Sequence, residues 1–422
     1  MTPSLTLSHA QSARYGLLGL PLAFVAMPLY VVLPAHYAQV LGVPLGLLGG
    51  LLLLTRLMDA FVDPLIGRWI DRLLSRPQRA LAWVWVMAMM LTIGFTALFF
   101  PPRSSQSALL WWCALSLLVT FGAYSFGSVL HLAWGSRLGG ALIQRSRLVA
   151  WREGFGVIGV VLANVVAVQA GPGWTALVLL LTLLLGAGAL VSGPRPDEAV
   201  GLASPEAAGH RTWTLPWRGQ PFRRLLSLFL LNGVASAMPA TLVLFFIRDR
   251  LQAPMWTAVF LASYFLMAAL SVPFWLKCMA RWGAARTWCA GMVLSVLSFA
   301  GVMALGAGDV LPYLLICMCS GWALGADLTA PATMLTAVLQ HEGHARQAEG
   351  AYAGWWQWAT KLNLALAAGL ALPALQWLGY APGETDASAL LSLTMVYGAV
   401  PCVFKLMSLV LCWCWRHQRA WS

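Results

Sequence analysis

Three ionisable residues lie close together in one long apolar stretch of this sequence. Arg56, Asp59 and Asp63 are separated by three and four positions, a spacing that places all three on the same face of a helix. Two carboxylates one helical turn apart can supply oxygen ligands to a small hard cation, or they can share a transferable proton. Arg56 could hold both acids ionised when no cation is bound. The alternative is a buried Arg–Asp network that only locks helices together.

Further ionisable residues occur in other apolar stretches, where a charge is costly and therefore indicates function. Lys361 requires a carboxylate, a backbone carbonyl or water as a partner, and we assign it to ion coupling or to pairing between halves of the chain. A purely structural ion pair is the alternative. Asp327 is the acid of the second half that we expect to face a cavity, with a helix-packing hydrogen bond as the alternative. For Lys405 the sequence suggests no partner.

Polar and aromatic side chains in the same stretches are candidate solute ligands. His131 could relay a proton or hydrogen-bond a solute, and a histidine satisfied by a neighbouring helix is the alternative. Arg152 could reach a cavity or extend to the membrane surface. Trp356 could stack on a sugar ring or face lipid. The predicted solute ligands are Ser128, His131, Trp134, Arg152, Tyr352, Trp356 and Gln357.

The composition determines which class of protein carries these residues. Of the 422 residues, 60% are hydrophobic and only 9% are charged, whereas soluble domains are about half apolar and roughly a quarter charged. So little charge cannot cover a water-exposed surface, which excludes soluble enzymes and DNA-binding proteins. We therefore expect a lipid bilayer around the protein and no nucleic-acid partner.

Catalytic and cofactor motifs are missing from the sequence. The eight cysteines lie mostly in apolar runs, without the second Cys/His pair that a zinc site requires. There is no nucleotide-binding loop of the G-x-x-x-x-G-K-[ST] type, and no nucleophile, base and acid occur at a plausible spacing. We predict that the protein is not an enzyme and binds no cofactor.

Twelve apolar segments reach the roughly 20 residues that a helix needs to cross a bilayer. They lie near residues 13–40, 45–74, 79–100, 106–136, 149–169, 173–193, 222–247, 255–277, 286–306, 310–340, 349–377 and 387–415. The only long polar connection is rich in proline and acidic residues, which is typical of a linker. We therefore predict an all-α membrane protein with one six-helix half at 1–193, a cytoplasmic linker at 194–220 and a second six-helix half at 221–422.

The basic residues predict the orientation of these helices. With the N-terminus inside, 20 of the 26 lysines and arginines fall in inner loops, in the linker or at the two ends. This is the positive-inside pattern, which places both termini in the cytoplasm and accounts for the net charge of +12. Short basic turns follow both the second and the eighth segment, forming a weak internal repeat. Two six-helix halves with a central linker are the layout of the major facilitator fold, in which the solute site lies between the halves.

The second segment resembles the signature of a known family. Its residues 55–67, TRLMDAFVDPLIG, are followed by Asp71 and are similar to the signature of the glycoside–pentoside–hexuronide:cation symporters. The segments RLVAWRE at 147–153 and EGAYAGWWQWATK at 349–361 continue the resemblance. It implies symport of a small polar solute, often a sugar, driven by Na⁺, Li⁺ or H⁺. It also implies that Asp59, Asp63 and Ser125 bind the cation and that Lys361 takes part in coupling.

The departures from the family pattern concern the sugar. Ala23 and Ser128 stand where the family's melibiose permease has sugar-binding acids, Val62 replaces an asparagine beside the cation site, and Ala337 replaces an acid. The cation-binding residues are therefore kept, whereas those that grip a galactoside are missing, and melibiose is not the expected solute.

Our prediction is a secondary active transporter that couples Na⁺ or H⁺ to a small polar solute by alternating access. We expect a monomer with many membrane spans in a cell membrane, such as the inner membrane of a bacterium. The alternative is an uncoupled facilitator, or an exporter of an amphipathic or lipid-like compound, which the tryptophan-rich helices and the missing sugar-binding acids would suit.

Overall fold

The computed structural model describes residues 7–74, 76–102, 105–138, 142–195, 214–343, 349–416 and 418–421. Over these ranges the chain forms helices and no strands. In hydrocarbon the backbone amides and carbonyls have no water partner, and a helix satisfies them within its own segment.

Long helices correspond to all twelve predicted spans. In the first half they are α1 (His9–Gly16) with α2 (Gly19–Met27), η1 (Pro28–Val32), α3 (Leu33–Ala35) and η2 (His36–Val40); α4 (Leu45–Leu73); α5 (Pro77–Phe99); α6 (Gln106–Arg137); α7 (Leu142–Val165) with η3 (Val166–Ala170); and α8 (Gly171–Val191). In the second half they are α10 (Leu215–Arg218) before α11 (Gln220–Phe245) with η6 (Phe246–Arg250); η7 (Pro254–Trp256) with α12 (Thr257–Trp282); α13 (Ala284–Ala300) with η8 (Gly301–Ala304); α14 (Val310–His341); α15 (Glu349–Trp377); and α16 (Ala387–Thr394), η9 (Met395–Ala399) and α17 (Val400–Trp415), before the terminal turn η10 (Arg419–Trp421).

Ten helical segments among the described residues have the length and hydropathy of membrane spans. One of the ten segments is Gly154–Val191. It contains two helices, because Gly171, with φ of 81°, separates α7 from α8. α4, which carries the charged trio of Arg56, Asp59 and Asp63, is not among the ten. The predicted all-α membrane fold is confirmed.

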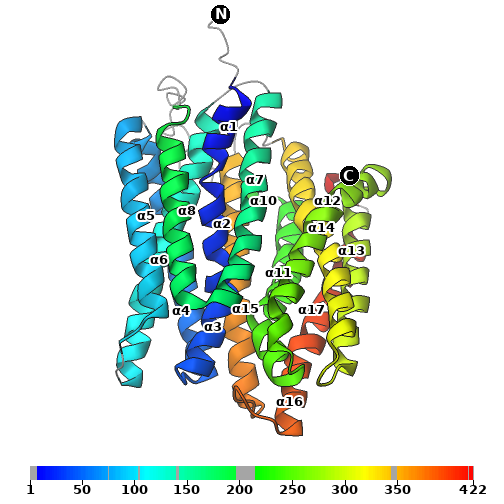
Figure 1. Cartoon of the computed structure of the whole chain (residues 1–422). Helices are drawn as coiled ribbons and strands as arrows, with labels where there is room; N and C mark the ends of the chain where they lie inside the picture. The colour runs from blue at the N-terminus through cyan, green and yellow to red at the C-terminus, as the bar shows by residue number, and fades with distance from the viewer. Residues whose placement is uncertain are drawn as a thin grey trace, which may run out of the picture. The chain divides into compact units, whose positions relative to one another are not determined.

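The chain packs as two compact units. The first comprises Met1–Leu33 with Met58–Pro205, and the second comprises Pro34–Leu57 with Glu206–Ser422. In the first unit α2 packs on α7 and α5 on α6, and in the second unit α12 and α13 pack on α14 and α11 packs on α15 (Figure 1). Most of the predicted linker, at 196–213, lies outside the described residues.

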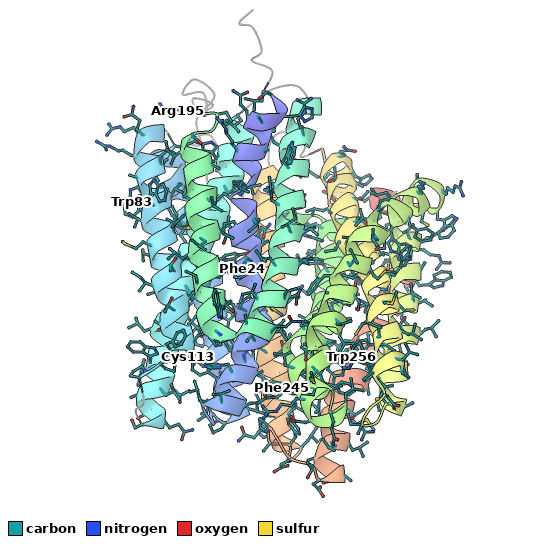
Figure 2. All side chains as sticks on the ribbon, in the orientation of Figure 1. Phe24, Trp83, Cys113, Arg195, Phe245 and Trp256 are labelled. Atoms are coloured by element: carbon teal, nitrogen blue, oxygen red, sulfur yellow. The ribbon has the colours of Figure 1, made fainter. Side chains whose placement is uncertain are left out.

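Large side chains divide between the interior and the surface of each unit. Phe24 in the first unit and Phe245 in the second are fully buried, whereas Trp83 and Trp256 project from their helices with 37% and 46% of their surface exposed (Figure 2). Tryptophan at helix surfaces suits the boundary between lipid and water, because its ring is apolar and its N–H is polar.

Two turns in the second unit follow the same backbone course. Each turn follows a π-helical segment, η2 or η6, and each contains a residue with positive φ, Gly42 at 68° and Gln252 at 54°. A proline, Pro44 or Pro254, stands two positions later. Equivalent hydrogen bonds close the two turns: Leu41 N to His36 O at 3.3 Å and Val43 N to Tyr37 O at 3.0 Å, and Leu251 N to Phe246 O at 2.9 Å and Ala253 N to Ile247 O at 3.0 Å. The chain thus contains a structural repeat where the two sequences share only the pattern Leu-x-x-Pro.

These turns predict different responses to the same substitution. Gly42→Ala should lower the free energy of unfolding by about 1 kcal/mol, because a Cβ is strained at positive φ. Gln252→Ala should leave it unchanged, because glutamine already carries that strain. Thermal unfolding of the purified protein in detergent measures both variants, and equal melting temperatures for the two would contradict the prediction.

Candidate functional site

The first unit contains a buried carboxylate with a hydroxyl partner. Asp59 of α4 is 6% exposed, and the Oγ of Ser125 in α6 donates a hydrogen bond to its Oδ1 at 2.8 Å. Ser125 is also buried. A buried carboxylate is costly unless it is paired or protonated, and carboxylate and hydroxyl oxygens are ligands that hard cations prefer. The pair is therefore chemically suited to hold either a small cation or a proton.

The rest of the charged trio lies on the same helix. Arg56 is buried and precedes Asp59 by three residues, which places both on one face of α4. The backbone of Asp63 continues α4 by one further turn, but its side chain lies outside the described residues. In the part of the chain that the structure describes, no three His, Cys, Asp or Glu side chains gather where they could hold a metal ion. A cation at Asp59 would thus need oxygen ligands from Asp63, from hydroxyls or from the backbone.

His131 and Trp134, two of the predicted solute ligands, lie in the packed interior of the first unit. The Nε2 of His131 is 2.9 Å from the carbonyl oxygen of Tyr15, and the hydroxyl of Tyr15 donates to the His131 carbonyl at 3.0 Å. Trp134 is completely buried, and its Nε1 donates to Pro194 O at 3.1 Å. For His131 the geometry favours the alternative of a histidine satisfied by a neighbouring helix, and Trp134 is likewise held in packing contacts.

Ser128 and Arg152 lie elsewhere in the same unit. Ser128 follows Ser125 by one turn of α6 and is half-buried. Arg152 of α7 packs against α2, where a Cβ on Gly19 would lie 2.8 Å from the Arg152 carbonyl oxygen. This close backbone approach fixes the position of Arg152 along α2. The side chain of Arg152 is half-buried.

The predicted ligands of α15 belong to the second unit and differ in exposure. Tyr352 is buried against Phe222, with ring centroids 4.9 Å apart. Trp356 stacks on Phe229 at 3.9 Å, so one face of its indole is already covered. Gln357 is exposed and Lys361 is half-buried. The last two are four residues apart and so share one face of the helix.

Asp327 of α14 is the centre of a polar network in the second unit. Its Oδ2 pairs with the Nζ of Lys405 in α17 at 2.5 Å, and the two side chains are 10% and 6% exposed. Three further donors reach the same carboxylate: Asn232 Nδ2 at 3.1 Å and Trp288 Nε1 at 2.8 Å on Oδ1, and Ser236 Oγ at 3.3 Å on Oδ2. Lys405 also donates to Ser236 Oγ at 2.8 Å. The network joins α11, α13, α14 and α17.

This network supplies the partner that the sequence did not suggest for Lys405. Asp327 and Lys405 are 78 positions apart, and only the tertiary packing of α14 and α17, each of which packs on α11 and α13, brings them together. Because four donors surround the carboxylate and one carries a full charge, Asp327 needs no mobile cation. The geometry therefore favours the helix-packing alternative over an acid that faces a cavity.

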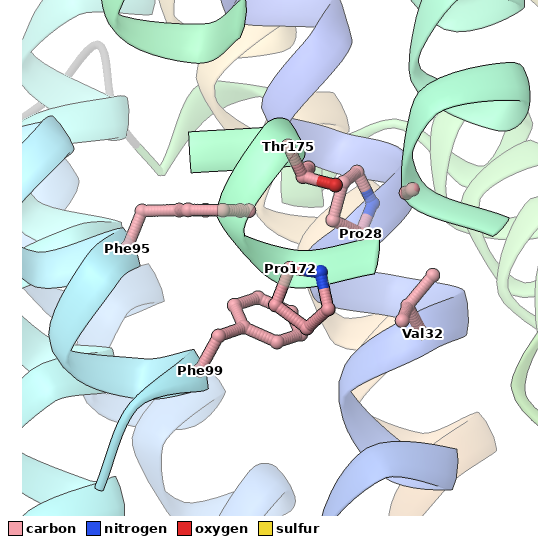
Figure 3. A pocket seen from close by; sticks show the side chains of 7 residues that line it. Pro28, Val32, Phe95, Phe99, Pro172 and Thr175 are labelled. Atoms are coloured by element: carbon pink, nitrogen blue, oxygen red, sulfur yellow. The ribbon is translucent and has the colours of Figure 1, made fainter. Parts of the chain in front are cut away.

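One small cavity lies in the first unit (Figure 3). Its volume is about 10 Å³, which is room for about one water molecule. It is lined by Pro28, Val32, Phe95, Phe99, Ala167, Pro172 and Thr175. The cavity is too small and too apolar to be the site of a polar solute.

Comparison with known proteins gives matches over the whole chain and over parts of it. A family model described as MFS/sugar transport protein matches residues 14–417. YagG of Escherichia coli (strain K12), provisionally named a glycoside/cation symporter, is 29% identical over 139 residues, which are 33% of this chain and 30% of YagG. The inner membrane symporter YicJ of the same organism is 26% identical over 129 residues, 31% of this chain and 28% of YicJ. These two matches thus span less than a third of each relative.

Solved structures resemble the fold along nearly the entire chain. The nucleoside transporter NupG matches with a TM-score of 0.68 at 15% identity, covering 96% of this chain and 98% of NupG. A bacterial homolog of the human lysosomal transporter Spinster, in an inward-facing and unoccupied conformation, matches with a TM-score of 0.68 at 12% identity, covering 96% of this chain and 95% of its own. At such identities the likeness shows the fold alone.

The Asp327–Lys405 pair predicts a non-additive response to substitution. Lys405→Met should destabilise the protein by about 3–5 kcal/mol, because it leaves a buried carboxylate without its countercharge. The double variant Lys405→Met/Asp327→Asn should recover most of that loss, because neither charge remains. Thermal unfolding and the folded yield after size-exclusion chromatography measure both. A double variant no more stable than Lys405→Met would show that charge pairing is not what the network supplies.

Proposed function

Because this chain belongs to the family of MFS/sugar transport proteins, whose members are membrane transporters and not enzymes, we propose that it carries a small polar organic solute, such as a sugar or glycoside, in symport with a cation. The observation that carries the proposal is the buried carboxylate of Asp59, which accepts a hydrogen bond from Ser125. The names of YagG and YicJ as symporters support the coupling.

Cation binding at Asp59 would change the electrostatics of the first unit. A carboxylate that is 6% exposed carries a desolvation cost, and a bound Na⁺, Li⁺ or H⁺ removes it by neutralising the charge. Ser125 orients Oδ1 and adds a hydroxyl oxygen, Asp63 supplies the second carboxylate, and Arg56 compensates the acids when the cation has left. The loaded site would favour the conformation that accepts the solute, and joint occupancy would allow alternating access.

Each unit offers candidate polar ligands for the solute. In the second unit Gln357 is exposed and Lys361 is half-buried, and in the first unit Ser128 and Arg152 are half-buried. His131, Trp134 and Tyr352 are buried in packing contacts. Amide, hydroxyl and cationic donors suit the hydroxyl-rich surface of a sugar. With no acid at Ala23 or Ser128, such a site would lack carboxylates that accept sugar hydroxyls in the first half.

The proposed protein is a monomer in the inner membrane of a bacterium, with both termini in the cytoplasm. The positive-inside distribution of lysine and arginine supports this orientation, and the name of YicJ as an inner membrane symporter supports the location. The end of the second unit that carries the turns at Gly42 and Gln252 then faces the outside.

A cation site at Asp59 predicts stabilisation by the coupling ion. A ligand that binds only the folded state stabilises it by about 2.7 kcal/mol at a hundredfold excess over its Kd. Raising Na⁺ or Li⁺ at constant ionic strength should therefore raise the melting temperature of the wild type in detergent, and Asp59→Asn should abolish the rise. The matched control Glu384→Gln removes an exposed acid and should keep the rise.

The outcomes separate the possible coupling ions from an uncoupled carrier. A melting temperature that responds to pH but not to alkali cations, with the response lost in Asp59→Asn, would indicate proton coupling. Identical behaviour of the wild type and Asp59→Asn under every ion and pH would refute symport through this site. The transporter would then be a facilitator, or an exporter of an amphipathic compound.

A further inference from the structure

Two cysteine side chains meet in the interior of the second unit, between α13 and α17. Cys289 of α13 is 4% exposed, and Cys412 of α17 is completely buried. Both are free thiols, and a hydrogen bond joins them. Because α13 packs on α17, two positions that are far apart in the sequence are brought into direct contact.

The backbone of α13 places the two sulfur atoms at the same point. The Sγ of Cys412 donates a hydrogen bond to the carbonyl oxygen of Ala285 at 3.6 Å. Ala285 precedes Cys289 by about one turn of α13. A helical side chain tilts toward the N-terminus and covers the turn that precedes it, so the Cys289 thiol lies over the turn that Cys412 contacts. The backbone geometry therefore accounts independently for the contact between the two thiols.

Cys402 provides an internal comparison at the same interface. It also belongs to α17, and its Sγ is 4.0 Å from the carbonyl oxygen of Val296 in α13. The single cysteine of α13 is Cys289, which precedes Val296 by about 10 Å along the helix. Cys402 thus packs on α13 without a thiol opposite it there, whereas Cys412 has one.

A positive charge lies beside the thiol pair. Arg416 directly follows α17, one turn beyond Cys412 and on the same face, and it is close enough to Cys289 to act on it electrostatically. The thiolate is the nucleophilic form of cysteine, and an arginine and a hydrogen-bond donor both stabilise it. Cys289 has the arginine nearby and the Cys412 thiol as its hydrogen-bond partner, so it is the nucleophile of the pair.

We propose that Cys289 and Cys412 form an oxidation site, at which a hydroperoxide converts the two thiols into a disulfide that cross-links α13 and α17. The Cys289 thiolate attacks the O–O bond and becomes a sulfenic acid, and the alkoxide that leaves takes up the thiol proton as an alcohol. The Cys412 sulfur then attacks the sulfenic sulfur, and the sulfenic oxygen leaves as water with the Cys412 proton. The two sulfurs together lose two electrons, which the hydroperoxide gains.

Lipid hydroperoxides suit this site because both thiols are buried among apolar side chains. They are uncharged and dissolve in hydrocarbon, whereas a charged oxidant would have to be desolvated. In the orientation proposed above, α17 ends at the cytoplasmic face, where thiols are kept reduced, so the dithiol is the resting form. The remainder of the proposal is independent of the proposed function, since neither the solute nor the cation enters it.

The disulfide would reinforce the polar network around Asp327. Trp288, the neighbour of Cys289, donates to Asp327 from α13, and Lys405 pairs with Asp327 from α17. These are the two helices that the disulfide cross-links. Oxidation would therefore add a covalent link to an arrangement that already depends on one ion pair, and it would stabilise the second unit.

Mass spectrometry of the wild-type protein tests whether the disulfide forms. The purified protein is reduced, treated with cumene hydroperoxide in detergent, blocked with N-ethylmaleimide and digested with chymotrypsin. Cleavage after Trp288 and Trp413 separates Cys412 from Cys414. We expect a linked peptide pair that contains Cys289 and Cys412 as the main disulfide. Maleimide on both of these cysteines, or a main disulfide between other cysteines, would overturn the proposal.

Serine variants test the roles of the two thiols. Cys289→Ser and Cys412→Ser should each abolish the linked pair, whereas the matched control Cys402→Ser should keep it. In Cys412→Ser the sulfenic acid has no second thiol to react with, so dimedone should label Cys289, and the wild type should take up little label. Equal labelling of the two proteins would show that Cys412 does not complete the reaction and would overturn the proposal.

Thermal unfolding tests the consequence of oxidation. Cumene hydroperoxide should raise the melting temperature of the wild type by a few degrees, because the cross-link restricts the unfolded chain, and it should not raise that of Cys289→Ser. Equal shifts in the two proteins would overturn the stabilising role. Asp59→Asn should form the disulfide like the wild type, so failure of the cation coupling and failure of the oxidation site are separate results. If the serine variants do not fold, the linked peptides of the wild type still decide whether the site exists.

Discussion

A charge or a backbone amide in the hydrocarbon of a membrane has no water to bind, so each one needs a partner within the protein. This constraint accounts for the helices, which satisfy the backbone over each span. It also explains why the few buried charges of this chain determine so much of its architecture. Asp327 ties four helices of the second unit together because four donors must converge on one carboxylate.

Asp327 and Asp59, two of the little-exposed acids that the structure describes, meet this constraint in different ways. Lys405 gives Asp327 a fixed countercharge at 2.5 Å, and the pair is neutral without any ligand. Ser125 donates a hydrogen bond to Asp59, and Arg56 lies one turn away on the same face of α4. Under the proposed function, Asp327 has a packing role and Asp59 has the exchangeable one.

Glycine allows close packing between helices, because helices in lipid can associate tightly only where side chains are small. Gly49 and Gly369 let α4 and α15 approach closely, and Gly135 gives room to the Tyr15 hydroxyl, which donates a hydrogen bond to the His131 carbonyl. The Asp327 network thus joins helices of the second unit through a buried ion pair, whereas close packing at glycine joins α4 to α15 without one.

The sequence by itself determined the helices, the membrane setting and the family resemblance. Span length, hydropathy and the spacing of Arg56, Asp59 and Asp63 are local properties, and bilayer thickness and helical periodicity act on each segment separately. The partners depended on the tertiary structure. Lys405 meets Asp327 across 78 positions and His131 meets Tyr15 across 116, because long-range helix packing selects which faces meet. That packing is also why His131 and Trp134, which sequence reasoning placed at the solute, lie in the interior. The two repeated turns have the same backbone course although their sequences share only Leu-x-x-Pro.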